Sequence, residues 1–182
     1  MKKRKITALL LCAAVIFTLT ACAGQEESGP SVSLEDTEDT AGTPAGGDNI
    51  LIAYFSVPET DGTDTVAGAS RVSVDGQVMG NNEYVAHLIQ QQTGGDLFAI
   101  ETEQEYPGTH DELLDFAYNE MTEEARPALA SQIENLDSYD TIFLGYPNWW
   151  GDMPMAVYTF LETYDLSGKT VIPFVTSGGS GF

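Results

Sequence analysis

Four short, almost continuously apolar runs constrain the fold of this chain more than any other sequence feature. Each run has the length and the branched or aromatic side chains of a strand that is buried on both faces. The runs cover residues 50–55, 96–101, 141–144 and 171–175. Amphipathic helical patterns lie between them, at residues 82–93, 109–121 and 154–163. Strands that alternate with helices favour right-handed βαβ connections, so we expect an α/β fold with a doubly wound parallel sheet.

Local signals refine the limits of these elements. Gly94 follows the first helical pattern and is expected to end that helix, whose buried side we assign to Leu88 and its neighbours one turn away. Thr109 and Glu112 have the spacing of a capping box at the start of the second helix. Asp75-Gly76 lies in a Gly-, Asp- and Ser-rich stretch and indicates a hairpin.

The N-terminus has the pattern of a targeting signal. Basic residues at 2–5 precede an apolar run at 6–19, which is shorter than the roughly 20 residues that a membrane-spanning helix needs. Leu19-Thr20-Ala21-Cys22 resembles the bacterial lipobox, in which the cysteine is lipidated. We therefore predict a lipoprotein signal peptide at 1–21 and a lipid anchor at Cys22 on the extracytoplasmic face of the cell membrane. An ordinary cleaved signal with an incidental cysteine is the alternative.

Residues 22–48 contain Gly, Ser, Pro, Thr and acidic residues with almost no aliphatic side chains. Such a stretch buries too little apolar surface to offset its chain entropy, so we predict an acidic, flexible tether followed by one domain at 49–182.

The charge of the chain excludes some functions. After the signal only Arg71, Arg126 and Lys169 are basic, against 28 acidic residues. Nucleic-acid binding needs clustered basic side chains, so we expect no nucleic-acid partner. The acidic residues match no calcium-loop pattern, and we predict no metal site. A negative surface instead favours protein partners with basic patches.

Ligands of open parallel sheets bind beyond the carboxyl ends of the strands. Three loops at those ends are unusual. The first runs from Ser56 to Gly80, Asn81 and Asn82, where a glycine, a hydroxyl and short polar side chains at a helix N-terminus could hold an anion. No Lys or Arg flanks this loop, so neutral donors would hold the anion. The alternative is a plain asparagine helix cap.

The second loop contains both tryptophans, Trp149 and Trp150, between Pro147-Asn148 and Gly151. One indole can face the core, and an exposed one at the rim of a site suggests stacking on a planar ring. Alternatively, the tryptophans only pack against the end of the sheet.

The third loop, 176–181, contains three glycines that let the backbone approach a ligand closely. The alternative is a flexible tail.

The order and spacing of these pieces resemble the flavodoxin-like family, and the resemblance extends over residues 49–182. It rests on residues 50–56, on Gly80-Asn81-Asn82-Glu83, on Tyr146-Pro147-Asn148-Trp149-Trp150-Gly151, and on residues 168–174 with the glycine-rich loop that follows. The resemblance implies a sheet of strand order 2-1-3-4-5 that binds FMN without a covalent bond.

The resemblance also assigns roles to residues. Those implied to hold the FMN phosphate are Ser56, Gly80, Asn81 and Asn82. Those implied to contact one side of the isoalloxazine ring are Pro147, Asn148, Trp149, Trp150 and Gly151. Those implied to contact it from the other side through their backbone are Thr176, Ser177, Gly178, Gly179 and Gly181.

Two departures from the family pattern matter. Residues 57–79 form an insertion in what is usually a compact phosphate loop; they could fold beside the site or disrupt it. The family's last strand and last helix have no counterpart before Phe182, so we expect a truncated domain.

The resulting hypothesis is an FMN-binding protein that acts in electron transfer or flavin-dependent oxidoreduction at the extracytoplasmic membrane surface. The flavin would carry the chemistry, a redox protein with a basic patch would be its partner, and no side chain is predicted to be catalytic. The alternative is a non-catalytic extracytoplasmic binding module that kept the fold and lost the flavin.

Overall fold

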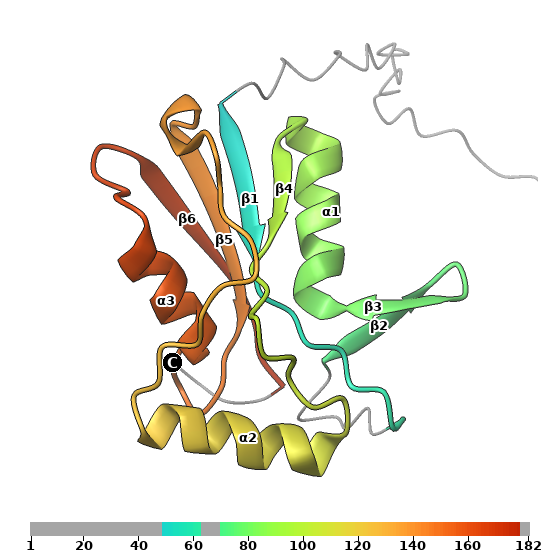
Figure 1. Ribbon diagram of the computed structural model, residues 1–182. Helices are drawn as coiled ribbons and strands as arrows, with labels where there is room; N and C mark the ends of the chain where they lie inside the picture. Colours follow the sequence, from blue (N-terminus) through green and yellow to red (C-terminus); the bar gives the residue numbers. More distant parts are fainter. Residues whose placement is uncertain (1–48, 63–69, 179–182) are drawn as a thin grey trace, which may run out of the picture. The chain divides into compact units, whose positions relative to one another are not determined.

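The predicted parallel sheet is present, with its strands in the predicted order. The computed structural model describes residues 49–62 and 70–178. The sheet contains β1 (Ile50–Tyr54), β4 (Asp96–Ala99), β5 (Thr141–Pro147) and β6 (Thr170–Thr176). Their spatial order is β4-β1-β5-β6 with every neighbouring pair parallel, which corresponds to positions 2-1-3-4 of the predicted sheet (Figure 1).

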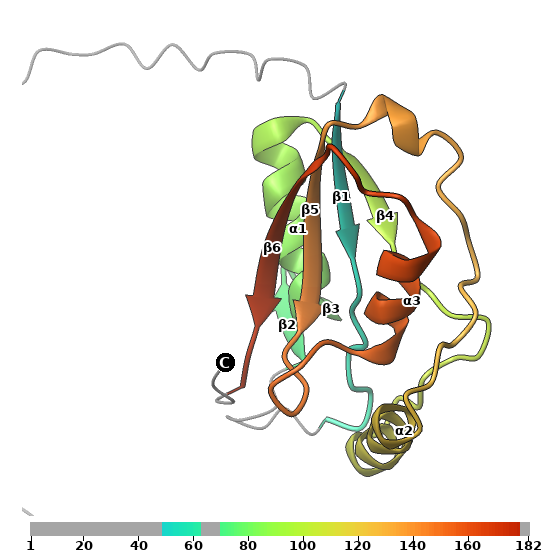
Figure 2. The same ribbon diagram turned by 90° about the vertical axis from the view of Figure 1, so that its left-hand side faces the viewer.

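Helices cover both faces of the sheet. α1 (Asn81–Thr93) lies on one face and α3 (Met155–Thr163) on the other, as Figure 2 shows. α2 (His110–Thr122) lies beyond the carboxyl ends of the strands, where ligands of such sheets bind. A short 3₁₀ helix, η1 (Leu136–Ser138), precedes β5. The architecture is therefore doubly wound α/β.

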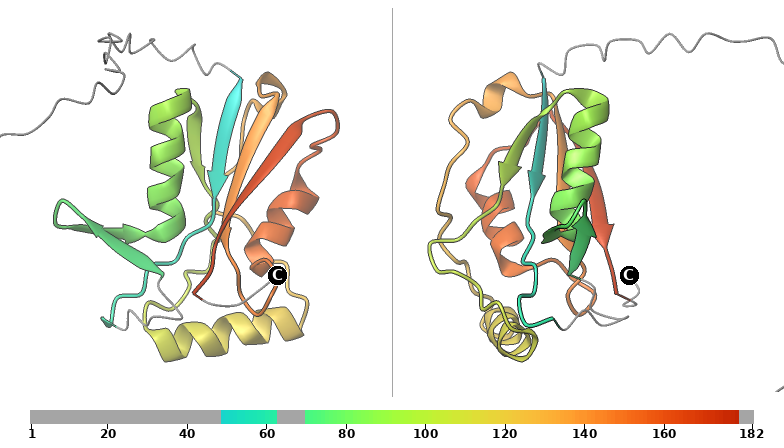
Figure 3. Two further views of the ribbon diagram at one scale, coloured as in Figure 1. Left: turned by 180° about the vertical axis from the view of Figure 1, so that it is seen from behind. Right: turned by 90° about the vertical axis from the view of Figure 1, so that its right-hand side faces the viewer.

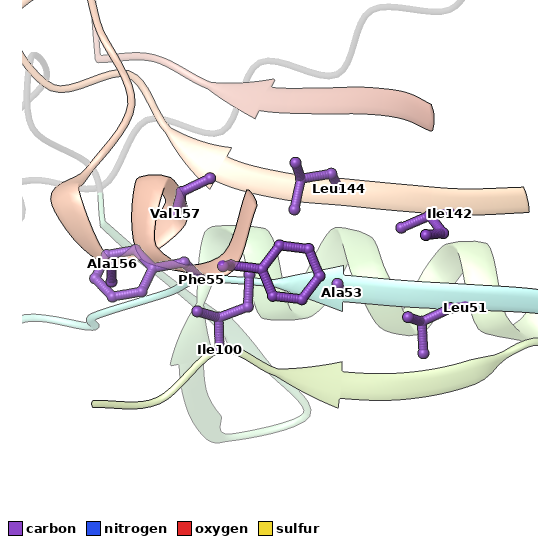
Figure 4. Close-up of a cluster of buried hydrophobic side chains, with 9 residues drawn as sticks. Leu51, Ala53, Phe55, Ile100, Ile142, Leu144, Ala156 and Val157 are labelled. Carbon is purple, nitrogen blue, oxygen red and sulfur yellow. The ribbon is translucent and has the colours of Figure 1, made fainter. Parts of the chain in front are cut away.

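The main core lies between the sheet and α3. Along β1, Leu51 and Ala53 point to this side, as does Phe55 just beyond the strand, while Ile52 is buried on the opposite face. Val157 and Phe160 of α3 are completely buried against them. Figure 4 shows Phe55 and Leu144 beside Ala156 and Val157, so that the core reaches the carboxyl ends of the strands. This packing fixes the strand ends that carry the functional loops.

The predicted hairpin is also present, inside the 57–79 insertion. β2 (Arg71–Val74) and β3 (Gln77–Gly80) pair antiparallel. Asp75 and Gly76 connect them with φ angles of 52° and 80°, which is the left-handed region that a two-residue hairpin turn requires. The hairpin leads directly into α1 and lies beside its N-terminal end in Figure 3.

Three sequence expectations are wrong in detail. The buried side of α1 consists of Asn82 and Ala86, and Leu88 is 41% exposed, because a small side chain lets the helix approach the sheet closely. The Thr109 hydroxyl bonds to the Glu112 carboxyl group (2.6 Å) and not to a backbone amide, so no capping box forms. The third strand extends to Pro147, beyond the predicted residue 144, because β6 pairs with it that far.

The predicted signal peptide, the tether and the lipid anchor at Cys22 lie outside the described residues, as do Gly179 and Gly181. Within the described part of the chain, every helix is too short or too polar to cross a bilayer.

Candidate functional site

The three predicted loops meet beyond the carboxyl ends of the strands. The Asn82 side-chain amide donates from Nδ2 to the Thr176 hydroxyl (2.9 Å), which joins the first loop to the third. The backbone amide of Asn148 donates to the carbonyl oxygen of Thr176 (2.8 Å), which joins the second loop to the third. Residues more than 90 positions apart in the sequence are thus held at one place.

Ser56 and Gly80 lie against each other although 23 residues separate them. A Cβ atom on residue 80 would overlap the Ser56 hydroxyl oxygen and lie 2.9 Å from Ser56 Cβ. Only glycine leaves room for the serine hydroxyl at the N-terminus of α1. The insertion therefore does not separate the two halves of the predicted anion cradle, by which we mean Ser56, Gly80, Asn81 and Asn82.

Two charged residues, Glu83 and Arg71, lie next to the residues of this cradle. The Gly80 amide donates to Glu83 Oε2 (3.1 Å), and the Asn81 amide donates to the Ser70 carbonyl oxygen (3.0 Å). Glu83 places a negative charge near the positive end of the α1 dipole. Arg71 pairs with Gly80 in the hairpin, so the expectation that no basic residue flanks the cradle is wrong. The hairpin register, which the sequence does not show, brings this arginine there.

The tryptophan loop is a tight turn. Trp149 and Asp152 exchange two backbone hydrogen bonds of 3.0 Å, and the residues between them have positive φ angles, 52° at Trp150 and 84° at Gly151. A bulky residue in this region is strained, and such strain is found preferentially at functional sites. Trp150 is 45% exposed, whereas Trp149 packs edge-on against Phe55 at 5.6 Å between ring centroids. One indole supports the core and the other is available to a ligand.

Tyr106 supports the tryptophan loop from the core. Its ring contacts Trp149 with centroids 6.0 Å apart, and its hydroxyl donates to Glu120 Oε2 of α2 (2.6 Å). Burial, followed by this hydrogen bond, raises the pKa of Tyr106 far above its usual range, and burial raises the pKa of Glu120. The tyrosine therefore stays neutral and links α2 to the wall of the site.

A cavity of about 190 Å³ lies between these loops and α2. The predicted site residues that line it are Ser56, Asn82, Pro147, Asn148, Trp149, Trp150, Thr176 and Gly178. Gly80, Asn81, Gly151 and Ser177 do not line it. Asn81, Gly151 and Ser177 are each adjacent in the chain to a residue that does, and Gly80 lies two residues before Asn82. The lining residues that the sequence analysis missed are Val57, Glu59, Ser70, His110, Leu113, Leu114 and Ala117.

Glu59 and His110 form a polar pair in this cavity. Glu59 is 4% exposed, and its Oε1 lies 2.5 Å from His110 Nδ1. Because a carboxylate only accepts hydrogen bonds, the imidazole donates. The second carboxylate oxygen of Glu59, Oε2, is buried and has no hydrogen-bond partner within residues 49–62 and 70–178. The His110 backbone amide donates to Asp61 (2.9 Å), so that the segment after β1 is tied to the start of α2.

This pair predicts a pH dependence. The hydrogen bond to Glu59 raises the pKa of His110 above its ordinary 6.5. Because the pKa of His110 is higher in the folded state than in the unfolded state, protonation of this histidine stabilises the fold. This stabilisation is complete below pH 6.5 and is lost as the pH rises through the folded-state pKa. An NMR titration of the His110 ring protons should show a pKa above 6.5 that falls toward 6.5 in Glu59→Gln. An unchanged pKa in the variant would contradict the pairing.

The described residues of the site offer groups that suit an organic ligand. Across residues 49–62 and 70–178, no three His, Cys, Asp or Glu side chains converge on a point where an ion could be held. The cavity instead combines apolar and aromatic walls with a few hydroxyl, amide and carboxylate groups, as small-molecule sites do.

A comparison with family models identifies the family of the chain. The family model described as Flavodoxin matches residues 71–182. No curated protein matches the chain. A crystal structure of a protein from Bacteroides eggerthii that is assigned as a flavoprotein is 35% identical, with a TM-score of 0.54, over 72% of this chain and 72% of that one. A similarly assigned protein from Bacteroides uniformis is 33% identical, with a TM-score of 0.56, over 74% of this chain and 75% of that one.

A third structure shares the fold at lower identity. It is a flavoprotein from Lactobacillus acidophilus in complex with FMN, 19% identical, with a TM-score of 0.52, covering 73% of this chain and 77% of that one.

Proposed function

The chain belongs to the flavodoxin family, and we propose that it binds FMN in the cavity beyond its strand ends and uses it in electron transfer or flavin-dependent oxidoreduction. The observation that carries this proposal is the junction of the anion cradle and the tryptophan turn on one cavity. Bound FMN would supply one- and two-electron transfer, and the protein would hold and orient it. FMN in the Lactobacillus acidophilus flavoprotein supports the proposal.

The residues of the site fit a flavin mononucleotide. Ser56 can donate its hydroxyl to a phosphate, and the dipole of α1 favours negative charge at this helix end, although the Gly80 and Asn81 amides already donate to Glu83 and Ser70. Asn82 is 2% exposed, and its Oδ1 has no hydrogen-bond partner in the part of the chain that the structure describes. Because the Thr176 hydroxyl can donate or accept, either end of the Asn82 amide can face a ligand. The exposed indole of Trp150 offers a flat surface to a ring.

The first experiment identifies the cofactor. The full chain is purified without added flavin, denatured, and the released compound is identified by chromatography and mass spectrometry. We expect FMN at up to one per chain, and bleaching of the bound flavin by dithionite with recovery in air. A purified chain that contains no flavin and takes up none from excess FMN would favour the alternative, a binding module without a cofactor.

Glu83→Gln should strengthen FMN binding. Glutamine keeps an oxygen that can accept from the Gly80 amide but removes a negative charge beside the predicted phosphate position. Charge effects at helix termini are about 0.3–1 kcal/mol, so the affinity should rise roughly two- to fivefold. Riboflavin, which lacks the phosphate, is the control ligand. Equal gains for FMN and riboflavin would contradict the assignment of the phosphate to this cradle.

We further propose that Cys22 is lipidated and that the domain acts at the extracytoplasmic face of the membrane with a redox partner that carries a basic patch. The lipobox-like sequence supports the anchor, and the excess of acidic residues supports the partner's charge. Full-length protein should fractionate with membranes and incorporate labelled fatty acid, whereas Cys22→Ser should not be labelled. Labelling that is equal in both proteins would argue against the anchor.

A further inference from the structure

The side of the cavity that faces α2 contains a polar group that the cradle and the tryptophan turn leave unexplained. We call Glu59, His110, Leu113, Leu114 and Ala117 the α2 subsite. Glu59 Oε1 is satisfied by His110, but the buried Oε2 has no partner among the described residues. A buried carboxylate oxygen without a hydrogen bond costs free energy of folding, and native structures rarely leave such an atom without a partner. Its place in a cavity wall indicates that a ligand supplies the missing donor.

The charges around the subsite indicate which charge a ligand that donates to Glu59 Oε2 can carry. His110 donates to Glu59 and this hydrogen bond raises the pKa of the imidazole, so the histidine offsets part of the negative charge of the carboxylate. Arg71 donates to the backbone carbonyl of Glu59 (3.1 Å) and leaves the carboxylate to the histidine. Asp61, which accepts from the His110 backbone amide, adds negative charge nearby. These surroundings disfavour an anionic ligand, and a cationic one is not needed.

The rest of the subsite is apolar. Leu113 and Ala117 are buried residues of α2, and Leu114 extends the same wall toward solvent. Trp150 lines the same cavity, and its ring centroid is 5.7 Å from that of Tyr118 on α2. Flat apolar walls with one acceptor suit an aromatic ring that carries a hydroxyl group.

We propose that Glu59 and His110 bind a neutral hydroxylated aromatic molecule, a second ligand that lies beside the flavin. The ligand's hydroxyl donates to Glu59 Oε2, and its ring packs on Leu113, Leu114 and Ala117. The position beside FMN rests on the proposed function, but the binding of the hydroxylated ring itself does not.

The test compares two probes that differ only in the donor. 4-Methylphenol carries a hydroxyl group, and p-xylene has a methyl group of similar size in its place. Both are titrated into the full chain, and the His110 ring protons are followed by NMR, first without FMN and then with FMN at saturation. A hydrogen bond to a charged group should favour 4-methylphenol about tenfold to a hundredfold. Glu59→Gln should reduce this preference, whereas Glu112→Gln, the same change at an exposed α2 residue, should not.

Three results would overturn the inference: equal affinity for the two probes, an unchanged preference in a Glu59→Gln variant that melts like the wild type, or displacement of 4-methylphenol by FMN. The last result would mean that the flavin itself occupies the subsite. If the chain binds 4-methylphenol selectively but no FMN, the proposed function fails while the subsite stands.

Discussion

Replacing Gly80 with alanine is expected to weaken FMN binding about tenfold to a hundredfold. The new Cβ would overlap the Ser56 hydroxyl oxygen and crowd Ser56 Cβ at 2.9 Å, so the serine must rotate or the two segments must separate. Overpacking of this kind costs about 1–3 kcal/mol. If this cost destabilises only the FMN-bound state, it corresponds to the stated loss of affinity. Isothermal titration with FMN measures the effect.

A double-mutant cycle separates this explanation from a general loss of stability. In a Ser56→Gly background the side chain that the alanine would meet is absent, and the next nearest atom, Pro58 Cδ, is 3.7 Å away. Gly80→Ala should therefore have little further effect on FMN affinity in that background. Fully additive losses would show that Gly80 matters for a reason other than making room for the Ser56 hydroxyl.

Truncating Phe160 to alanine should destabilise the domain by about 3–5 kcal/mol. Phe160 is completely buried and packs against Phe98 and Tyr164, with ring centroids 6.2 Å and 5.0 Å away. Removing it leaves a cavity between α3 and the sheet. Since domains of this size have about 5–15 kcal/mol of stability, a large part would be lost. Urea unfolding followed by circular dichroism gives the free energy of unfolding.

Leu161→Ala is the matched control, because Leu161 is the next residue of the same helix and is only partly buried. It should cost clearly less than Phe160→Ala. Similar losses for both variants would mean that the centre of the core is not where the structure places it.

The strands were predictable because they are local patterns with a strong physical cause. Runs such as residues 50–55 are apolar on both faces, which suits strands covered by helices on two sides, and the structure confirms them. The hairpin at Asp75-Gly76 was predictable because that dipeptide readily adopts positive φ angles. The buried side of α1 was not, because it consists of Asn82 and Ala86, which a search for large apolar side chains overlooks.

The site was predictable only in part. Loops at the ends of strands can be located from the sequence, and the structure brings Ser56, Asn82, Trp150 and Thr176 to one cavity. The Glu59–His110 pair could not be located, because it joins residues 51 positions apart and depends on the path of the chain after β1. No periodicity or motif encodes such a contact.

The central claim is that one FMN binds beside the tryptophan turn, and a fluorescence titration of the full chain tests it most directly. Trp149 and Trp150 are the protein's only two tryptophans, and both line the cavity, so their emission reports on this site alone. We predict saturable quenching that ends at one FMN per chain, with riboflavin requiring a higher concentration because it lacks the phosphate. Emission that is unchanged, or that falls without saturation, would contradict the claim.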